Sequence, residues 1–216
     1  MTQSTNRHIT LFHSPQSRSV GAHTLLEELG ADYELHVLNL NTKDQRAASY
    51  LAINPMGKVP AIHHGDVLVT EQAAIFIYLA DLYAEAGLAP ALDSPLRGSY
   101  LRWMVFYGSC FEPALMDLAM KREAPPQSMS PYDNADTVLK TMSDQLAKGP
   151  YMLGERFSAL DVLWGMALDW TVGFKLVPET PLLRAYINSI TSRPATLRAR
   201  AKNAELIAVQ TAAQKP

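Results

Sequence analysis

Residues 54–62 read Asn-Pro-Met-Gly-Lys-Val-Pro-Ala-Ile, and residues 70–79 read Thr-Glu-Gln-Ala-Ala-Ile-Phe-Ile-Tyr-Leu. The first stretch runs into a short apolar strand at Pro60, and a proline leaves backbone groups unpaired because it cannot donate to a sheet ladder. In the second stretch Glu71 stands at the start of a helix, beside N–H groups that have no partner within the helix. Together the two stretches offer a ligand hydrogen-bonding groups of the backbone, a carboxylate for its ammonium group and helix N–H groups for its carboxylate. This combination suits a small γ-linked peptide.

The residues around these stretches alternate between strand and helix patterns. We expect strands at 8–12, 34–40, 59–62 and 66–69, and helices at 22–29, 43–52 and 71–85. Gly30 ends the first helix, and a tight turn at residues 64–66 joins the last two strands. The order βαβ, α, ββα predicts a small mixed sheet with helices on its faces.

Beyond Gly87 the strand patterns stop. Residues 87–95 are rich in proline and small residues and read as a linker. Helical patterns follow at 96–121, 133–148 and 160–172, and two more begin near Leu182 and after Pro194, while Pro113 is expected to kink or divide the first of them. The sequence therefore predicts an α/β domain at residues 1–86 and an all-helical domain at residues 96–216.

Composition excludes several classes of protein. A net charge of −2 gives no general attraction to nucleic acid or to an acidic membrane, and a basic run between residues 184 and 202 reads as a solvated helix face. The only cysteine, Cys110, fits a reducing compartment and reads as a packing residue. The polar start and the lack of a long apolar stretch predict a cytoplasmic protein. All six histidines precede Gly65 with no helical i, i+4 pair, so we predict no metal site.

The motifs resemble those of the cytosolic glutathione transferases over nearly the whole chain. The resemblance lies in Asn54-Pro-x-Gly-Lys-Val-Pro60, in Glu71 opening a helix, and in Phe157-Ser158-x-x-Asp161 of the helical half, which has the pattern of a capping box. It implies a thioredoxin-like first domain, a C-terminal helical bundle and a homodimer. It also implies glutathione as a co-substrate, with no other cofactor.

Carried over to this chain, the resemblance places glutathione against the first motif. Val59 would offer its N–H and C=O, and Pro60 would be cis. Glu71 would meet the γ-glutamyl end, and Lys58 matches a position that often makes a polar contact. Most family members have serine at the position of Gln72, so an amide here alters the contact geometry. Lys43 and Gln45 are further candidates for the glycyl carboxylate; for both lysines a solvated surface position is an equal alternative.

Catalysis in this family means stabilising a thiolate, which a hydroxyl at the start of a helix can do. Residues 12–20 lie between the first strand and the first helix, and they contain neither tyrosine nor cysteine. The turn thus resembles the serine-type classes (theta, zeta, tau and phi), with Ser14 at the position of the catalytic serine. Ser17 and Ser19 are the alternatives, as a helix cap and a first-turn residue.

A second substrate is expected between the domains, against the aromatic face of the long helix. Trp103, Phe106 and Tyr107 are the candidates, although aromatic residues at helical spacing often belong to a core. The expected function is transfer of glutathione to small hydrophobic electrophiles. A glutathione-dependent peroxidase with the same site, and a non-catalytic binding protein of the same fold, are the alternatives.

Overall fold

The sheet of the N-terminal half holds strands in the order β2-β1-β3-β4, in a computed structural model that describes residues 7–123 and 125–213. The strands are β1 (Ile9–His13), β2 (Tyr33–Val37), β3 (Ala61–His64) and β4 (Val67–Val69). β1 pairs with β2 in parallel and with β3 antiparallel, and β3 pairs antiparallel with β4. The predicted mixed sheet and its element order are confirmed, and the fold is thioredoxin-like.

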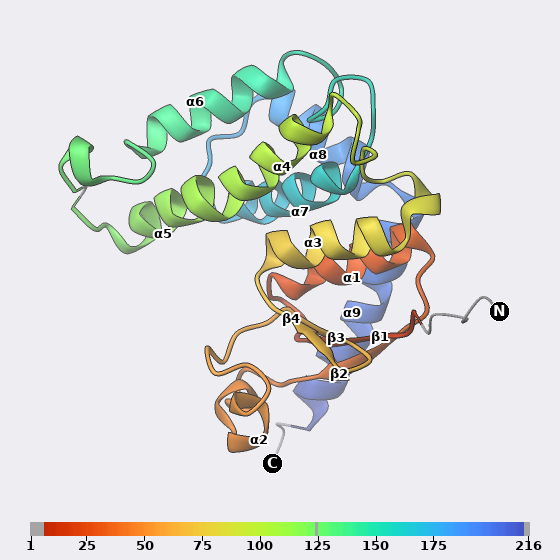
Figure 1. Cartoon of the computed structure of the whole chain (residues 1–216). Coiled ribbons are helices and arrows are strands. Elements are labelled where there is room, and N and C mark those ends of the chain that lie inside the picture. The colour runs from red at the N-terminus through yellow and green to blue at the C-terminus, as the bar shows by residue number, and fades with distance from the viewer. Residues whose placement is uncertain (1–6, 124, 214–216) are drawn as a thin grey trace. The chain divides into compact units, whose positions relative to one another are not determined.

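Helices cover both faces of this sheet (Figure 1). They are α1 (Ser19–Leu29), α2 (Ala48–Leu51), α3 (Gln72–Leu82) and α9 (Pro194–Ala212). α1 packs on β1, α3 and α9. Leu11 and Phe12 are both buried and, as neighbours in a strand, point to opposite faces. Phe12 contacts Tyr50 of α2, with ring centroids 5.6 Å apart, so α2 covers the face opposite α1.

The chain divides into two compact units, and the division differs from the sequence-based one at the C-terminal end. The first unit runs to Ala86 and resumes at Arg193, while the second spans Gly87–Ser192. The sequence patterns predicted a helical domain over all of residues 96–216. α9 instead packs with the first unit, because its buried face lies along α1, and because Arg193, just before α9, and Arg198, within it, pair with α1 carboxylates.

The second unit is helical. Its elements are α4 (Arg97–Phe106), a π-helical turn (Tyr107–Phe111), α5 (Glu112–Met120), α6 (Ala135–Leu146), α7 (Ala159–Gly173) and α8 (Pro181–Thr191). The π turn divides the long helix expected at 96–121, and Pro113 lies in the first turn of the helix that follows. Ser158 and Asp161 form the predicted capping box of α7, and Asp161 accepts a 2.8 Å bond from the Ser158 N–H.

Candidate functional site

The turn between β1 and α1 is held by hydrogen bonds to its backbone. The N–H of Ser14 donates to Ser19 Oγ at 3.0 Å. The carbonyl of Ser14 accepts from Ser17 Oγ at 2.6 Å and lies 3.0 Å from Ser19 Oγ. These bonds fix the direction in which the Ser14 side chain leaves the turn.

The three hydroxyls of the turn differ in how they are used. Those of Ser17 and Ser19 lie 2.7 Å apart and both contact the Ser14 carbonyl, so they are engaged within the turn. Ser14 Oγ reaches only the Pro15 carbonyl at 3.5 Å, which is a weak contact. Ser14 is 2% exposed, and a hydrogen bond in such a surrounding is stronger than one in water. Of the three hydroxyls, that of Ser14 is therefore the least engaged in hydrogen bonds within the turn.

The loop that precedes β3 leaves the backbone of Val59 open. The Lys58 carbonyl accepts from Tyr50 Oη at 2.6 Å and from Asn54 Nδ2 at 2.9 Å, which fastens the loop from one side. The Val59–Pro60 bond is cis, as the family resemblance implied. Neither the N–H nor the C=O of half-buried Val59 hydrogen-bonds to any residue within 7–123 and 125–213. The sequence-based inference of unpaired backbone at this edge is confirmed.

The sheet register brings this loop to the serine turn. Leu11 pairs with Ile62 and Phe12 with Ala61 in the antiparallel ladder. Ser14 follows Phe12 by two residues, and Val59 precedes Ala61 by two. The Ser14 turn and the open backbone of Val59 thus lie beyond the same end of the two central strands.

The start of α3 reaches the same turn. Gln72 Nε2 donates to the Arg18 carbonyl at 3.4 Å. Glu71, immediately before the helix, is exposed and has a φ of 65°, a conformation uncommon for a residue with a side chain. Its carboxylate and the N–H groups of the first helical turn belong to the start of α3, where such groups can meet charged groups of a ligand. Lys58 and Lys43 are exposed, and Gln45 is half-buried.

Comparison with known proteins agrees with this geometry. Residues 7–81 match the family model for the N-terminal domain of glutathione S-transferases. A glutathione transferase structure from Methylococcus capsulatus is 30% identical, with a TM-score of 0.76 over 91% of this chain and 98% of that one. The chain belongs to the glutathione S-transferase family. A sphingomonad glutathione S-transferase solved with glutathione is 32% identical, with a TM-score of 0.72 over 90% of this chain and 98% of that one.

Curated members of the glutathione S-transferase family also align along most of the chain. The enzyme GstA of Escherichia coli O157:H7 is 28% identical over 189 residues, which is 85% of this chain and 93% of that protein. The glutathione S-transferase of Hyoscyamus muticus is 27% identical, over 81% of this chain and 88% of that protein. Both units are therefore covered by relatives of the same family.

The aromatic candidates for the second substrate surround Trp164 in the helical unit. Trp103 and Tyr107 are 1% and 3% exposed, and their ring centroids lie 6.0 and 5.6 Å from that of Trp164. Phe106, at 6.3 Å, is half-buried. Trp103 and Tyr107 are thus core residues in this chain, and Phe106 retains the surface that could touch a ligand. Cys110, expected to be a packing residue, is half-buried in the π turn.

Sequence reasoning missed the residues that connect α9 to the serine turn. His13, His23 and Asn203 are buried together in the first unit. Asn203 lies four residues after Ala199 and seven after Thr196, and all three are buried on one face of α9. This helical spacing was the available signal. The basic run is largely exposed, as expected of a solvated face, but Arg193 is half-buried and pairs with Glu28 at 2.6 Å, and exposed Arg198 pairs with Glu27 at 2.6 Å.

Metal-holding clusters and membrane-spanning helices are both absent from the part of the chain that the structure describes. No three histidine, cysteine, aspartate or glutamate side chains within residues 7–123 and 125–213 are grouped so as to hold a metal ion. No helix in these ranges is both long enough and apolar enough to cross a membrane.

Proposed function

We propose that this protein is a glutathione transferase in which Ser14 stabilises the thiolate of bound glutathione. The observation that carries the proposal is a weakly bonded Ser14 hydroxyl beyond the same end of the β1–β3 pair as the unpaired backbone of Val59. Relatives support it, since the sphingomonad structure and one from Sulfitobacter, 28% identical, were both solved with glutathione.

In this proposal glutathione binds along the unpaired backbone of Val59. Val59 forms the two backbone hydrogen bonds of an added strand with the cysteinyl residue, and Pro60 leaves that edge free of a competing donor. Glu71 pairs with the γ-glutamyl ammonium group. Gln72 and the N–H groups at the start of α3 receive the γ-glutamyl carboxylate, and Lys58 contributes a cation nearby.

Ser14 then acts on the sulfur. A free thiol has a pKa near ~8.5 and is mostly protonated at neutral pH. Lowering this pKa by ~2 units needs about 2.7 kcal/mol of preferential interaction with the anion. The Ser14 hydroxyl donates to the thiolate, and the thiol proton leaves to water. The sulfur attacks the electrophilic carbon of the second substrate, the new carbon–sulfur bond forms, and the leaving group departs with its electron pair.

The remaining assignments belong to the same proposal. Residues 1–86 form the glutathione-binding domain, and the helical region provides a surface for a small hydrophobic electrophile that includes Phe106. The protein acts in the cytoplasm as a homodimer, and its activity serves detoxification.

Three measurements test the function. The protein is passed over immobilised glutathione, and turnover is measured with an aryl halide and with an organic hydroperoxide. We expect retention on glutathione and turnover of the aryl halide. Turnover of the hydroperoxide alone would indicate a peroxidase, retention without turnover a binding protein, and no retention would refute the assignment of the glutathione site.

Serine variants test the mechanism. Ser14→Ala should lower kcat/KM by roughly 100-fold, as loss of a preorganised donor does, and should raise the pKa of the bound thiol. Ser17→Ala is the matched comparison, because it removes a hydroxyl of the same turn that already donates to the Ser14 carbonyl. An equal effect of the two variants would contradict the assignment of Ser14.

A further inference from the structure

A continuous chain of hydrogen bonds runs from the Ser14 turn across the interior of the first unit. It consists of Ser14 N to Ser19 Oγ (3.0 Å), Ser19 Oγ to His13 Nδ1 (2.9 Å), His13 Nε2 to Asn203 Oδ1 (3.0 Å), Asn203 Nδ2 to His23 Nδ1 (3.1 Å), His23 Nε2 to Tyr33 Oη (2.9 Å), and Tyr33 Oη to the Glu27 carboxylate. Asn203 is the only member contributed by α9. Because Asn203 lies in the middle of this series of hydrogen bonds, it joins the inner half, nearest Ser14, to the outer half, which ends at Glu27.

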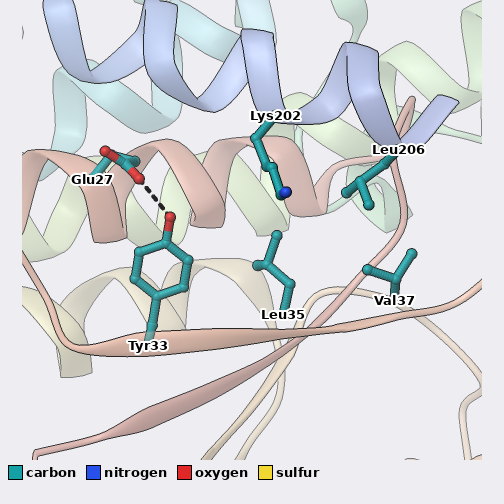
Figure 2. Close-up of a pocket in the computed structure, with 6 residues that line it drawn as sticks. All are labelled: Glu27, Tyr33, Leu35, Val37, Lys202 and Leu206. Atoms are coloured by element: carbon teal, nitrogen blue, oxygen red, sulfur yellow. Dashed lines mark hydrogen bonds between the residues drawn. The ribbon is translucent and has the colours of Figure 1, made fainter. Parts of the chain in front are cut away.

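The outer end fixes the direction of the bonds. Burial opposes ionisation of Glu27, but bonds from Tyr33 and Arg198 outweigh it and lower its pKa, so the group is a carboxylate that only accepts. Tyr33 therefore donates to Glu27, as Figure 2 shows at the wall of a surface pocket of about 480 Å³. Its oxygen must then accept from His23 Nε2–H, which leaves Nδ1 of His23 as an acceptor.

The Asn203 amide fixes the same tautomer independently. Its nitrogen lies 2.7 Å from the Ala199 carbonyl, which can only accept, so the orientation of the amide is settled. The same nitrogen therefore donates to His23 Nδ1, in agreement with the direction set by Glu27. The amide oxygen accepts from His13 Nε2–H, so Nδ1 of His13 is also an acceptor.

This tautomer of His13 determines to which acceptor the Ser19 hydroxyl donates its proton. Ser19 has one hydroxyl proton, and it goes to His13 Nδ1 rather than to the Ser14 carbonyl. The lone pairs of Ser19 Oγ are then available for the Ser14 N–H. Both histidines are neutral near pH 7, because burial, together with the neighbouring His23, lowers the pKa of His13 to about 4. Burial likewise lowers that of His23 to about 4, with Glu27 opposing and Lys202 reinforcing the shift.

We propose that Asn203 is a positioning residue for the Ser14 turn, which it reaches by holding His13 in the tautomer that orients the Ser19 hydroxyl. The inference rests on the proposed function of Ser14. Without the amide oxygen of Asn203, His13 Nε2–H has no acceptor. The ring can then carry its proton on Nδ1 without losing a hydrogen bond, and Ser19 turns its own proton toward the Ser14 carbonyl. The Ser14 carbonyl then gains a second donor beside Ser17, which changes the bonds that hold the turn, and a small displacement of a reacting group is costly in rate.

A double-mutant cycle tests this role. Asn203→Leu removes the amide at similar volume, and Ser19→Ala removes the hydroxyl through which Asn203 is proposed to act. Each single variant should lower kcat/KM with glutathione and an aryl halide about tenfold, and the double variant should be little worse than either, because both break one chain. Gln210→Met is the control on α9, since the Gln210 side chain donates to the Leu38 carbonyl at 3.3 Å, outside this series of hydrogen bonds. It should leave kcat/KM unchanged.

A spectroscopic measurement keeps the inference testable even where a variant fails to fold. Long-range nitrogen–proton NMR spectra of the unmodified protein should show His13 and His23 as neutral rings protonated at Nε2. In Asn203→Leu the His13 signal should move toward the Nδ1-protonated form. A His13 ring protonated at Nδ1 in the unmodified protein would overturn the proposal, and so would additive losses of about 100-fold in the double variant.

The two proposals fail in different ways. The tautomers are observed without glutathione, so they do not depend on the activity. An inactive protein with both histidines protonated at Nε2 would refute the proposed function, whereas an active protein with additive losses would refute the role of Asn203 alone.

Discussion

The Arg193 guanidinium binds the Glu28 carboxylate through two hydrogen bonds, Nε to Oε1 at 2.6 Å and Nη2 to Oε2 at 2.8 Å. Glu28 lies on α1, and Arg193 is the residue before α9. The Glu28 side chain is 8% exposed and that of Arg193 is 32% exposed, so the pair is largely removed from water. This bidentate contact anchors the start of α9 on α1, and with it the helix that carries Asn203.

Arg193→Met should destabilise the protein, because it leaves the Glu28 carboxylate buried without its partner. We expect a loss of about 2 kcal/mol in the free energy of unfolding, measured by urea denaturation. Adding Glu28→Gln should recover part of this loss, since the unpaired charge is then removed. Arg184→Met breaks the exposed pair with Glu179 and is the control, with the smaller effect. Equal effects of the two arginine variants would refute the role of the Arg193 anchor.

The buried histidines make stability depend on pH. In the folded protein the pKa of His13 and of His23 is about 4, whereas the ordinary histidine value, which applies to the unfolded chain, is 6.5. Between these values the unfolded chain binds more protons, so the free energy of unfolding falls as the pH is lowered. Asp161, whose pKa burial raises to about 6, acts in the opposite direction over part of the range.

We therefore expect a net loss of roughly 2 kcal/mol between pH 7 and pH 5, measured by urea denaturation at each pH. His23→Gln removes one of the two groups, and because Asp161 still opposes the other, the net loss of stability between pH 7 and pH 5 should fall to well under half of its value. A stability that is constant or rises toward pH 5 would contradict neutral burial of the two rings.

Asp161 joins three segments of the helical unit. It accepts from the N–H groups of Met152 and Ser158, both at 2.8 Å, and from Tyr186 Oη at 3.0 Å. Asp161→Asn replaces one accepting oxygen by a donor at the same volume and should cost roughly 3 kcal/mol in the free energy of unfolding. Asp144→Asn, at an exposed pair with Lys140, is the control and should change little. A similar small effect at Asp161 would show that its bonds are replaceable.

Local patterns were enough to predict the N-terminal fold. Apolar residues at 22, 25, 26 and 29 and the stop at Gly30 predicted α1, which ends at Leu29. Ser14 directly follows β1 and Val59 precedes β3, and the pairing of these two strands brings both residues to the same end of the sheet, so this part of the candidate site could also be predicted from the sequence. Ser14, Val59 and Glu71 all lie in turns whose composition is informative by itself.

The contribution of α9 could not be predicted in the same way. His13 and Asn203 are 190 positions apart, and no local pattern says which face of a distant helix meets a given strand. Asn203 sits among alanine and threonine positions whose helical spacing indicates only a buried face. Aromatic spacing left both a ligand surface and core packing open in the helical unit, and the side chains of Trp103 in α4 and Tyr107 in the π turn are buried in the core.

Gly57 holds the loop that presents Val59. Its φ is +59°, and a Cβ at this position would come within 2.7 Å of the Gln45 carbonyl oxygen. Gly57→Ala should therefore displace the loop, cost about 2 kcal/mol in the free energy of unfolding and weaken glutathione binding, measured by calorimetry. Gly65→Ala is the matched control, because its φ is +57° but its Cβ would meet open space. It should show only the backbone cost of about 1 kcal/mol with glutathione affinity intact. Equal losses of affinity in both variants would mean that the contact with Gln45 does not position Val59.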